Sequence, residues 1–191
     1  MTVLALSASP RRGGNTEELV FSFLEGARKE GKETEFIRLN DLKFRPCQAC
    51  DYCAPTGKCV LQDDMQLLYP KIEACEGLLL ATPVFFGTLS AQLKIFIDRF
   101  QCWWNAKYVL KTPFISSEGK KPSYFICVGA MKKKEYGENA LKTAEVFFNV
   151  TNLECQGNLI FRGYDKAGSI KEDPQNLQKA FDEGARFASL L

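Results

Sequence analysis

The sequence contains no histidine. This absence excludes a Ser-His-Asp triad, zinc ligation by imidazole and the usual general base at neutral pH. If the chain catalyses a reaction, the chemistry must therefore come from cysteines, from carboxylates or from a bound cofactor.

The sequence also lacks a long apolar run and a strong excess of either charge. No stretch approaches the ~18 apolar residues that a membrane-spanning helix needs, and the apolar start has no basic segment before it, as a secretory signal would have. The 25 basic and 23 acidic residues leave a net charge of +2. This balance argues against a nucleic acid or an anionic membrane surface as the main partner. We therefore expect a cytoplasmic protein with a small-molecule or redox partner.

What the sequence does contain is an alternation of apolar strands and amphipathic helices. We expect strands at about 3–6, 36–39, 77–83, 124–129 and 153–161, and helices at about 15–30, 65–75, 89–100, 137–150 and 174–190. Pro70 is expected to kink or restart the second helix. Strands that are apolar on both faces are typical of a parallel sheet covered on both sides. The prediction is one α/β domain over residues 1–191, with a doubly wound five-stranded sheet in the order 2-1-3-4-5 and a cysteine-rich insertion at about 40–62.

The loop after the first strand carries phosphate-binding chemistry. Its sequence, SASPRRGGNTE, supplies hydroxyls, guanidinium groups, an amide and free backbone donors at a helix N-terminus. The side chains concerned are Ser7, Ser9, Arg11, Arg12, Asn15 and Thr16. The loop lacks both the GKS/T ending of a Walker loop and the glycine spacing of a dinucleotide fingerprint, which disfavours ATP hydrolysis and a Rossmann-bound NAD. Asn15 and Glu18 also form a capping-box pattern for the helix that follows.

A second loop follows the third strand at the same edge of the sheet. The stretch TPVFFG offers a proline-fixed backbone, aromatic surface and a glycine, at Pro83, Val84, Phe85, Phe86 and Gly87. A flat tricyclic ring could lie against this surface. Each loop alone could be an ordinary turn or part of the core, but two matching loops beside one switch point of the sheet favour FMN as the ligand.

Four cysteines lie within the stretch CQACDYCAPTGKC, in the spacing C-x2-C-x2-C-x5-C. Zinc ribbons usually join two C-x2-C pairs across a longer gap, whereas three cysteines at successive x2 intervals suit the corners of a cubane. The predicted ligands of a [4Fe–4S] cluster are Cys47, Cys50, Cys53 and Cys59. Zinc, and a loop that is empty or contains a disulfide, stay as alternatives. The other cysteines stand singly in apolar surroundings, where a buried thiol is the default: Cys75, Cys102, Cys127 and Cys155.

These motifs together resemble the flavodoxin-like NADPH-dependent FMN reductases and, within them, the iron–sulfur flavoproteins. The resemblance is carried by SASPRRGGNTEEL, the cysteine cluster followed by DDM, TPVFFGTLSAQLKIFIDR and Gly129 at the end of the fourth strand, and it covers about residues 1–130. It implies that the FMN phosphate is bound by Ser9, Arg11, Asn15 and Thr16. It also implies that the ribityl chain and isoalloxazine ring lie near residues 83–87, with Gly129 at the pyrimidine edge, although Val128 and Ala130 depart from the usual small polar run.

The function we expect is that of an FMN-containing electron-transfer oxidoreductase. The cluster would accept single electrons and the flavin would pass them to a two-electron acceptor, a small molecule or a quinone, so no side chain is assigned a catalytic role. The resemblance implies ferredoxin or NAD(P)H as the donor and a homodimer or homotetramer. Two alternatives stay open: an NAD(P)H-dependent FMN or quinone reductase without a cluster, and a zinc-stabilised flavodoxin-like binding module. Because the segments after the first two strands leave the sheet side by side, the cluster and the flavin are expected to be neighbours.

Overall fold

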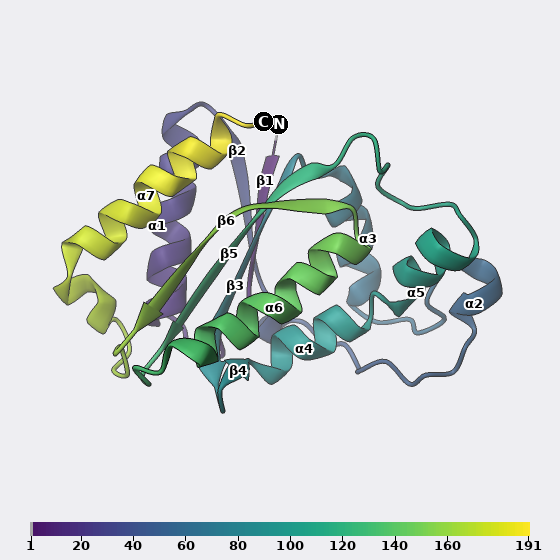
Figure 1. The fold of residues 1–191 in the computed structure, drawn as a ribbon, viewed down its shortest axis with the longest axis horizontal. Coiled ribbons are helices and arrows are strands. Elements are labelled where there is room, and N and C mark those ends of the chain that lie inside the picture. The colour runs from purple at the N-terminus through teal and green to yellow at the C-terminus, as the bar shows by residue number, and fades with distance from the viewer. Residues whose placement is uncertain (1) are drawn as a thin grey trace.

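The computed structural model describes residues 2–191 as a parallel sheet between two layers of helices (Figure 1). The strands are β1 (Thr2–Ser7), β2 (Glu33–Arg38), β3 (Gly77–Phe85), β4 (Thr88–Leu89), β5 (Lys121–Gly129) and β6 (Leu153–Arg162). The helices are α1 (Asn15–Lys29), α2 (Cys53–Thr56), α3 (Met65–Ala74), α4 (Ala91–Asp98), α5 (Gln101–Trp104), α6 (Lys134–Val150) and α7 (Pro174–Ala188). The five long strands pair in parallel in the order β2-β1-β3-β5-β6. The predicted flavodoxin-like order is therefore confirmed.

Strand β1 contributes to two separate cores, because successive side chains of a strand point to opposite faces. Val3 and Ala5 belong to the core beneath α1 and α7, whereas Leu4 and Leu6 belong to the core beneath α3, α4 and α6. Figure 1 shows these two groups of helices on opposite sides of the sheet. Burial on both faces is the physical reason why the strands read as continuous apolar runs in the sequence.

Helices α1 and α7 approach each other closely at two glycines. A Cβ added at Gly26 would lie 2.0 Å from the carbonyl oxygen of Phe181, and one at Gly184 would lie 1.9 Å from that of Phe23. Only a residue without a side chain fits at either position. The contact fixes α1, whose N-terminus forms part of the site described below.

One expectation about the helices is corrected, and one of two alternatives for another helix is excluded. Leu89 lies in β4, a two-residue strand that pairs antiparallel with the end of β3, and not in the helix that follows. That helix, α4, begins at Ala91 because Ser90 caps it, its hydroxyl accepting the backbone N–H of Leu93 at 3.4 Å. Helix α3 also passes through Pro70 without restarting there.

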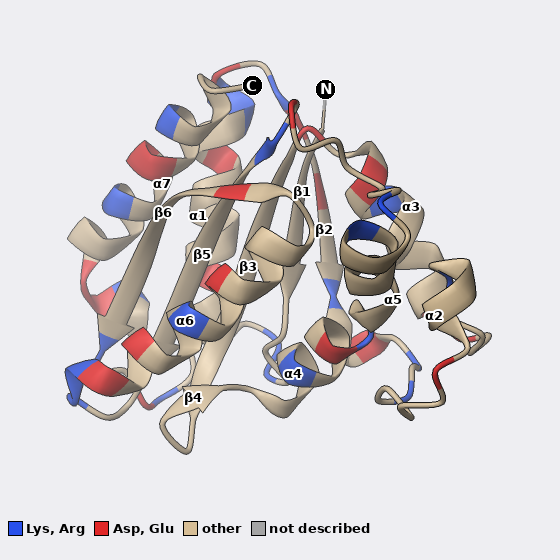
Figure 2. Ribbon diagram, turned by 45° about the vertical axis from the view of Figure 1, so that its right-hand side comes forward, with Lys and Arg blue, Asp and Glu red and all other residues tan. Residues whose placement is uncertain are grey.

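The surface carries charges of both signs, interspersed over the helices and loops (Figure 2). Most of the long strands between the helix layers are free of charged residues in the same view. No helix within residues 2–191 has the length and apolar character needed to cross a membrane.

Candidate functional site

The carboxyl ends of four parallel strands meet around one pocket. Its wall is built from residues 9–11 and 14–16 after β1, 83–85 at the end of β3, 128–130 at the end of β5, and 164–165 after β6. This is the edge of a doubly wound sheet at which ligands bind. The two loops singled out in the sequence therefore face one another across one pocket.

Most of the predicted cofactor-binding residues line this pocket, and three do not. Those that line it are Ser9, Arg11, Asn15, Thr16, Pro83, Val84, Phe85 and Gly129. Ser7 lies beneath the loop, fully buried, where its hydroxyl accepts the backbone N–H of Ser9 at 3.4 Å. Phe86 is fully exposed at the turn between β3 and β4, with a φ of 47°, and Gly87 beside it lies against Tyr136.

The part of the pocket nearest α1 has the chemistry of an anion site. The first backbone N–H groups of a helix have no acceptor within the helix, and the helix dipole adds partial positive charge there. Thr16 lies in this first turn, and the hydroxyl of Ser9 orders the loop by accepting the backbone N–H of Arg11 at 3.2 Å. Arg11 spans the pocket edge, where its Nη1 donates to the carbonyl oxygen of Asp165 at 2.9 Å.

The side chain of Asn15 holds the far wall of the pocket. Its Nδ2 donates to the carbonyl oxygen of Lys166 at 2.9 Å, and its Oδ1 accepts the backbone N–H of Ile170 at 3.0 Å. In this structure the side-chain amide thus supports the segment after β6, and its predicted contact with the FMN phosphate stays a prediction. The predicted capping box is wrong, because Gly14 occupies the N-cap and Asn15 is the first residue of α1.

A buried ion pair supports the phosphate loop from behind, and sequence reasoning missed it. The carboxylate of Glu17 accepts the backbone N–H of Gly13 at 2.7 Å and pairs with the guanidinium of Arg38. Arg38 also donates to the carbonyl oxygen of Pro10 at 3.4 Å. The one available signal was the helical spacing of Glu17 with Val20, which puts a carboxylate on the buried face of α1.

The wall formed by Tyr164 and Asp165 was also missed. Both residues follow β6, whose pairing with β5 is parallel. The carboxyl end of a fifth parallel strand must come to the same sheet edge as the others, so the topology itself predicts a fourth loop here. The residues themselves, Tyr164 and Asp165, belong to no sequence motif that indicates a binding site.

The predicted metal ligands share a second cavity, in the cysteine segment of residues 40–62. The cavity is lined by Cys47, Cys50, Cys53 and Cys59 together with residues that include Arg99 and Cys102. All four thiols are free, so the donor set fits a thiolate-bound group. Within residues 2–191, however, no three Cys, Asp or Glu side chains are arranged to hold a metal ion. The ligand assignment therefore stays a prediction.

Two of these sulfurs receive N–H donors from outside the segment. Asn105, just after α5, donates to Cys53 Sγ at 3.1 Å, and Arg99 Nη2, just after α4, donates to Cys59 Sγ at 3.4 Å. Burial raises the pKa of the Cys53 thiol, and the Asn105 hydrogen bond opposes that rise. Hydrogen bonds to sulfur are one of the means by which a protein tunes a thiolate-bound cluster.

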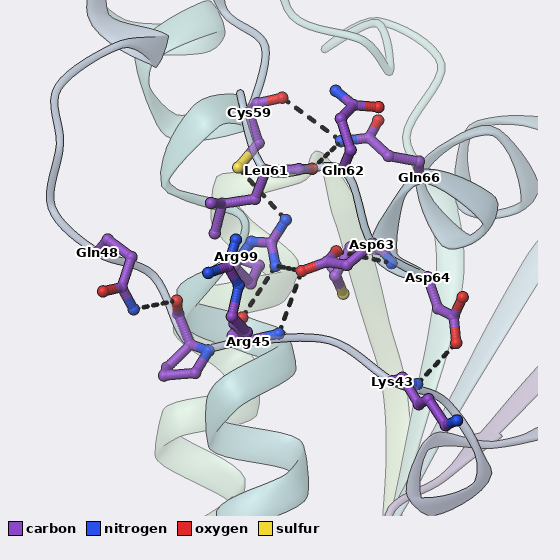
Figure 3. Close-up of polar contacts among 12 residues, drawn as sticks. Lys43, Arg45, Gln48, Cys59, Leu61, Gln62, Asp63, Asp64, Gln66 and Arg99 are labelled. Atoms are coloured by element: carbon purple, nitrogen blue, oxygen red, sulfur yellow. Dashed lines mark hydrogen bonds and ion pairs between the residues drawn. The ribbon is translucent and has the colours of Figure 1, made fainter.

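Arg99 and Asp63 form a buried ion pair under the segment (Figure 3). The distance between Arg99 Nη1 and Asp63 Oδ2 is 2.6 Å. Burial opposes ionisation of Asp63, but hydrogen bonds from Arg99 and from the backbone N–H of Arg45 outweigh it and hold the pKa of the carboxyl below its usual value. The pair is therefore charged at neutral pH.

The single cysteines are core residues, as predicted. Burial raises the pKa of Cys75 and Cys102 to about 11 and that of Cys127 to about 12, so each is a protonated thiol at neutral pH. Cys155 is half-buried against the same core. Cys102 additionally lines the cysteine cavity, which its isolated position in the sequence did not indicate.

The pocket at the sheet edge and the cysteine cavity share no lining residue. Helix α4 begins just after β4, which pairs with the end of β3 at the pocket, and it ends next to Arg99 at the cavity. Its eight residues span roughly 12 Å. Within one chain the two sites thus lie toward opposite ends of α4. The expectation that cluster and flavin are neighbours stays a prediction.

Comparison with known proteins gives a family match and several relatives. The family model described as NADPH-dependent FMN reductase matches residues 1–156. An iron-sulfur flavoprotein of Methanocaldococcus jannaschii is 44% identical over 99 residues, which are 52% of this chain and 51% of that protein. A putative NAD(P)H-dependent FMN-containing oxidoreductase of Bacillus subtilis is 28% identical over 184 residues, 94% of each chain.

A solved structure described as a flavone reductase covers 99% of this chain and 62% of its own, with a TM-score of 0.75 and 20% identity. At that identity the likeness concerns the fold. The chain spans about half the length of the iron-sulfur flavoproteins that it matches.

Proposed function

The chain belongs to the family of NADPH-dependent FMN reductases, and from that premise we propose that it is an oxidoreductase that passes electrons between a [4Fe–4S] cluster and FMN. The observation that carries the FMN part is the pocket at the sheet edge. It joins a helix N-terminus and a guanidinium to an apolar wall, as a ligand with a phosphate at one end and a flat ring at the other requires. We further propose that residues 1–191 act as one flavodoxin-like domain.

In this proposal the chain's part is to bind and orient the cofactor. The N–H groups of α1, the hydroxyls of Ser9 and Thr16 and the guanidinium of Arg11 bind the phosphate. Pro83 and the residues after it form the wall for the ring. At Gly129 a Cβ would lie 2.8 Å from that of Val84, so only glycine lets the end of β5 close this wall. Bound FMN supplies chemistry with either one or two electrons.

The cluster part of the proposal rests on three observations that agree. The cysteine spacing suits a cubane, the four free thiols line one cavity, and relatives that match half of the chain are named iron-sulfur flavoproteins. Cys47, Cys50, Cys53 and Cys59 would hold the cluster, which would supply one-electron chemistry.

The proposed donor is ferredoxin or NAD(P)H and the proposed acceptor a small molecule or a quinone, in the cytoplasm and with no nucleic acid or membrane partner. Because the two sites lie toward opposite ends of α4, we propose a homodimer or homotetramer that brings the cysteine cavity of one copy to the pocket of another. A reductase without a cluster is the second candidate, favoured by the relative of matching length named as an NAD(P)H-dependent FMN-containing oxidoreductase.

Anaerobic purification with iron, sulfide and flavin analysis tests the proposal. FMN together with iron and sulfide, and a broad shoulder beside the flavin absorbance bands, is the expected result. Flavin bands alone would favour the reductase without a cluster. The absence of both the flavin bands and the shoulder would favour the zinc-stabilised binding module.

Arg11→Ala is expected to weaken FMN binding by ~1.5 to 3 kcal/mol, because a charge-assisted contact with the phosphate is lost. Fluorescence titration with FMN measures the change in dissociation constant. Arg12→Ala is the matched control, because Arg12 does not line the pocket and pairs at 2.8 Å with Asp41. Equal dissociation constants for the Arg11 variant and wild type would count against the phosphate assignment.

Phe85→Ala is expected to shift the flavin spectrum or midpoint potential while the fold persists, because Phe85 lines the pocket. Phe86→Ala serves as its control, since Phe86 points to solvent at the adjoining turn. Visible spectra and redox titrations of both variants decide the matter. If both variants have the flavin spectrum and the midpoint potential of wild type, the flavin ring does not border Phe85 or Phe86.

A further inference from the structure

The cysteine segment rests on a buried cation. The side chain of Arg99 has 0% of its surface exposed, although an unpaired buried charge is strongly unfavourable. Its guanidinium makes all of its hydrogen bonds to the cysteine segment and to Asp63, which follows it directly (Figure 3): to Asp63 at 2.6 Å, to the carbonyl oxygen of Arg45 at 2.9 Å and to Cys59 Sγ at 3.4 Å. No other ion pair of the described residues touches one of the four predicted ligands.

These contacts join the chain just before the first predicted ligand to the chain just after the last one. Arg45 comes two residues before Cys47, and Asp63 comes four residues after Cys59. The Asp63 carboxylate adds to the tie by accepting the backbone N–H of Arg45 at 3.1 Å. The loop that carries all four thiols is therefore closed at its base by the Arg99 guanidinium and the Asp63 carboxylate, beside the backbone contacts of Lys43 with Asp64.

One nitrogen of this guanidinium, Nε, has no hydrogen-bond acceptor among the described residues. Arg99 lines the thiol cavity, and its Nε is buried with no hydrogen-bond acceptor among residues 2–191. A buried N–H without an acceptor is costly, and such a group in a native structure calls for an explanation. An apolar side chain could have filled the same space without this cost. Packing alone therefore does not account for an arginine here.

We propose that Arg99, anchored by Asp63, is the positioning residue of the cysteine site and offsets the negative charge gathered there. The inference rests on the proposed function and deepens it. The guanidinium holds Cys59 toward the cavity and places a positive charge beside the four sulfurs, which would be thiolates if they held a cluster. Because reduction of a bound cluster would add a further negative charge, the cation would stabilise the reduced form and raise the reduction potential.

The test is to reconstitute wild type, Arg99→Gln and Arg99→Lys anaerobically with iron and sulfide. Iron and sulfide per chain are measured, the cluster potential is followed by EPR during redox titration, and FMN content reports separately on the fold. We expect Arg99→Gln to bind less iron and, in the fraction that is loaded, to lower the ratio of reduced to oxidised cluster at a fixed potential at least tenfold. That ratio corresponds to about 59 mV for a one-electron couple. Arg99→Lys keeps the positive charge but not the guanidinium geometry that bonds three groups at once. Its iron content and its ratio of reduced to oxidised cluster should therefore lie between those of Arg99→Gln and wild type.

Lys94→Gln is the matched control. Lys94 also lies on α4 and pairs with a carboxylate, Asp98, at 2.7 Å, but this pair is exposed and does not touch the cysteine segment. Removing the same charge there should leave iron content and the ratio within twofold of wild type.

The outcomes separate the inference from the proposed function. Wild-type protein that binds FMN but takes up neither iron nor sulfide would overturn the cluster, and the inference with it. Loaded wild type together with an Arg99→Gln variant of unchanged iron content and potential would overturn the inference alone. If Arg99→Gln loses FMN as well as iron, its fold is damaged and Arg99→Lys becomes the test. An Arg99→Lys variant with the iron content and the cluster potential of wild type then overturns the inference.

Discussion

Cys53→Ser protein is expected to lose most of its iron and acid-labile sulfide together while it keeps FMN. A thiolate is then missing from a four-ligand site, so the cluster as a whole is destabilised. FMN should remain because the proposed phosphate loop lies on another strand end and shares no residue with the cysteine cavity. Iron, sulfide and flavin analysis after anaerobic reconstitution measures both effects, and serine at Cys47, Cys50 or Cys59 should give the same result.

Cys102→Ala is the control for this experiment. Cys102 lines the same cavity but stands outside the motif, and its thiol donates to the carbonyl oxygen of Arg99 at 3.3 Å. The variant should keep its iron, and a loss as large as that of Cys53→Ser would mean that the ligand set is different.

In Cys53→Ser, one-electron reduction by ferredoxin should collapse, whereas any direct reduction by NAD(P)H should survive.

The sheet could be predicted because its strands have a simple physical signature. Residues such as those of β1 and β3 are buried on both faces, which produces short apolar runs between helices of clear periodicity. Strand β4 could not be predicted, because two residues are too few to show a period. The spacing of Leu89 to Leu93 and Phe96 fits one helical face and so predicts that Leu89 belongs to the next helix, and only Ser90 marks where that helix begins.

The site was predictable as far as it consists of contiguous loops. Residues 9–11 and 14–16 follow β1 and residues 83–85 end β3, so their meeting at one pocket follows from the topology. The contacts between distant segments were not predictable. Arg11 reaches Asp165 across 154 positions, and Arg99 reaches Asp63 across 36. In a sequence with 25 basic and 23 acidic residues, nothing marks which charges will be buried together.

Arg38→Met is expected to lower the free energy of unfolding by about 3 to 5 kcal/mol, because it leaves the carboxylate of Glu17 buried without its cation. The two side chains are only 8% and 5% exposed. FMN affinity should fall as well, because Pro10 loses a donor to its carbonyl oxygen and an uncompensated negative charge remains behind the phosphate loop. Urea unfolding of the FMN-free protein and fluorescence titration with FMN measure the two effects.

The double variant Glu17→Gln/Arg38→Met separates the charge from the shape. Removing both charges should restore much of the lost stability, because the large cost comes from the unpaired carboxylate and not from the absence of the pair. Glutamine at position 17 still offers an oxygen to the backbone N–H of Gly13, so the loop keeps this support. Arg28→Met, which removes an exposed arginine from α1, should change stability by no more than ~0.5 kcal/mol. An Arg38→Met variant with wild-type stability and FMN affinity would show that the loop is held by other contacts.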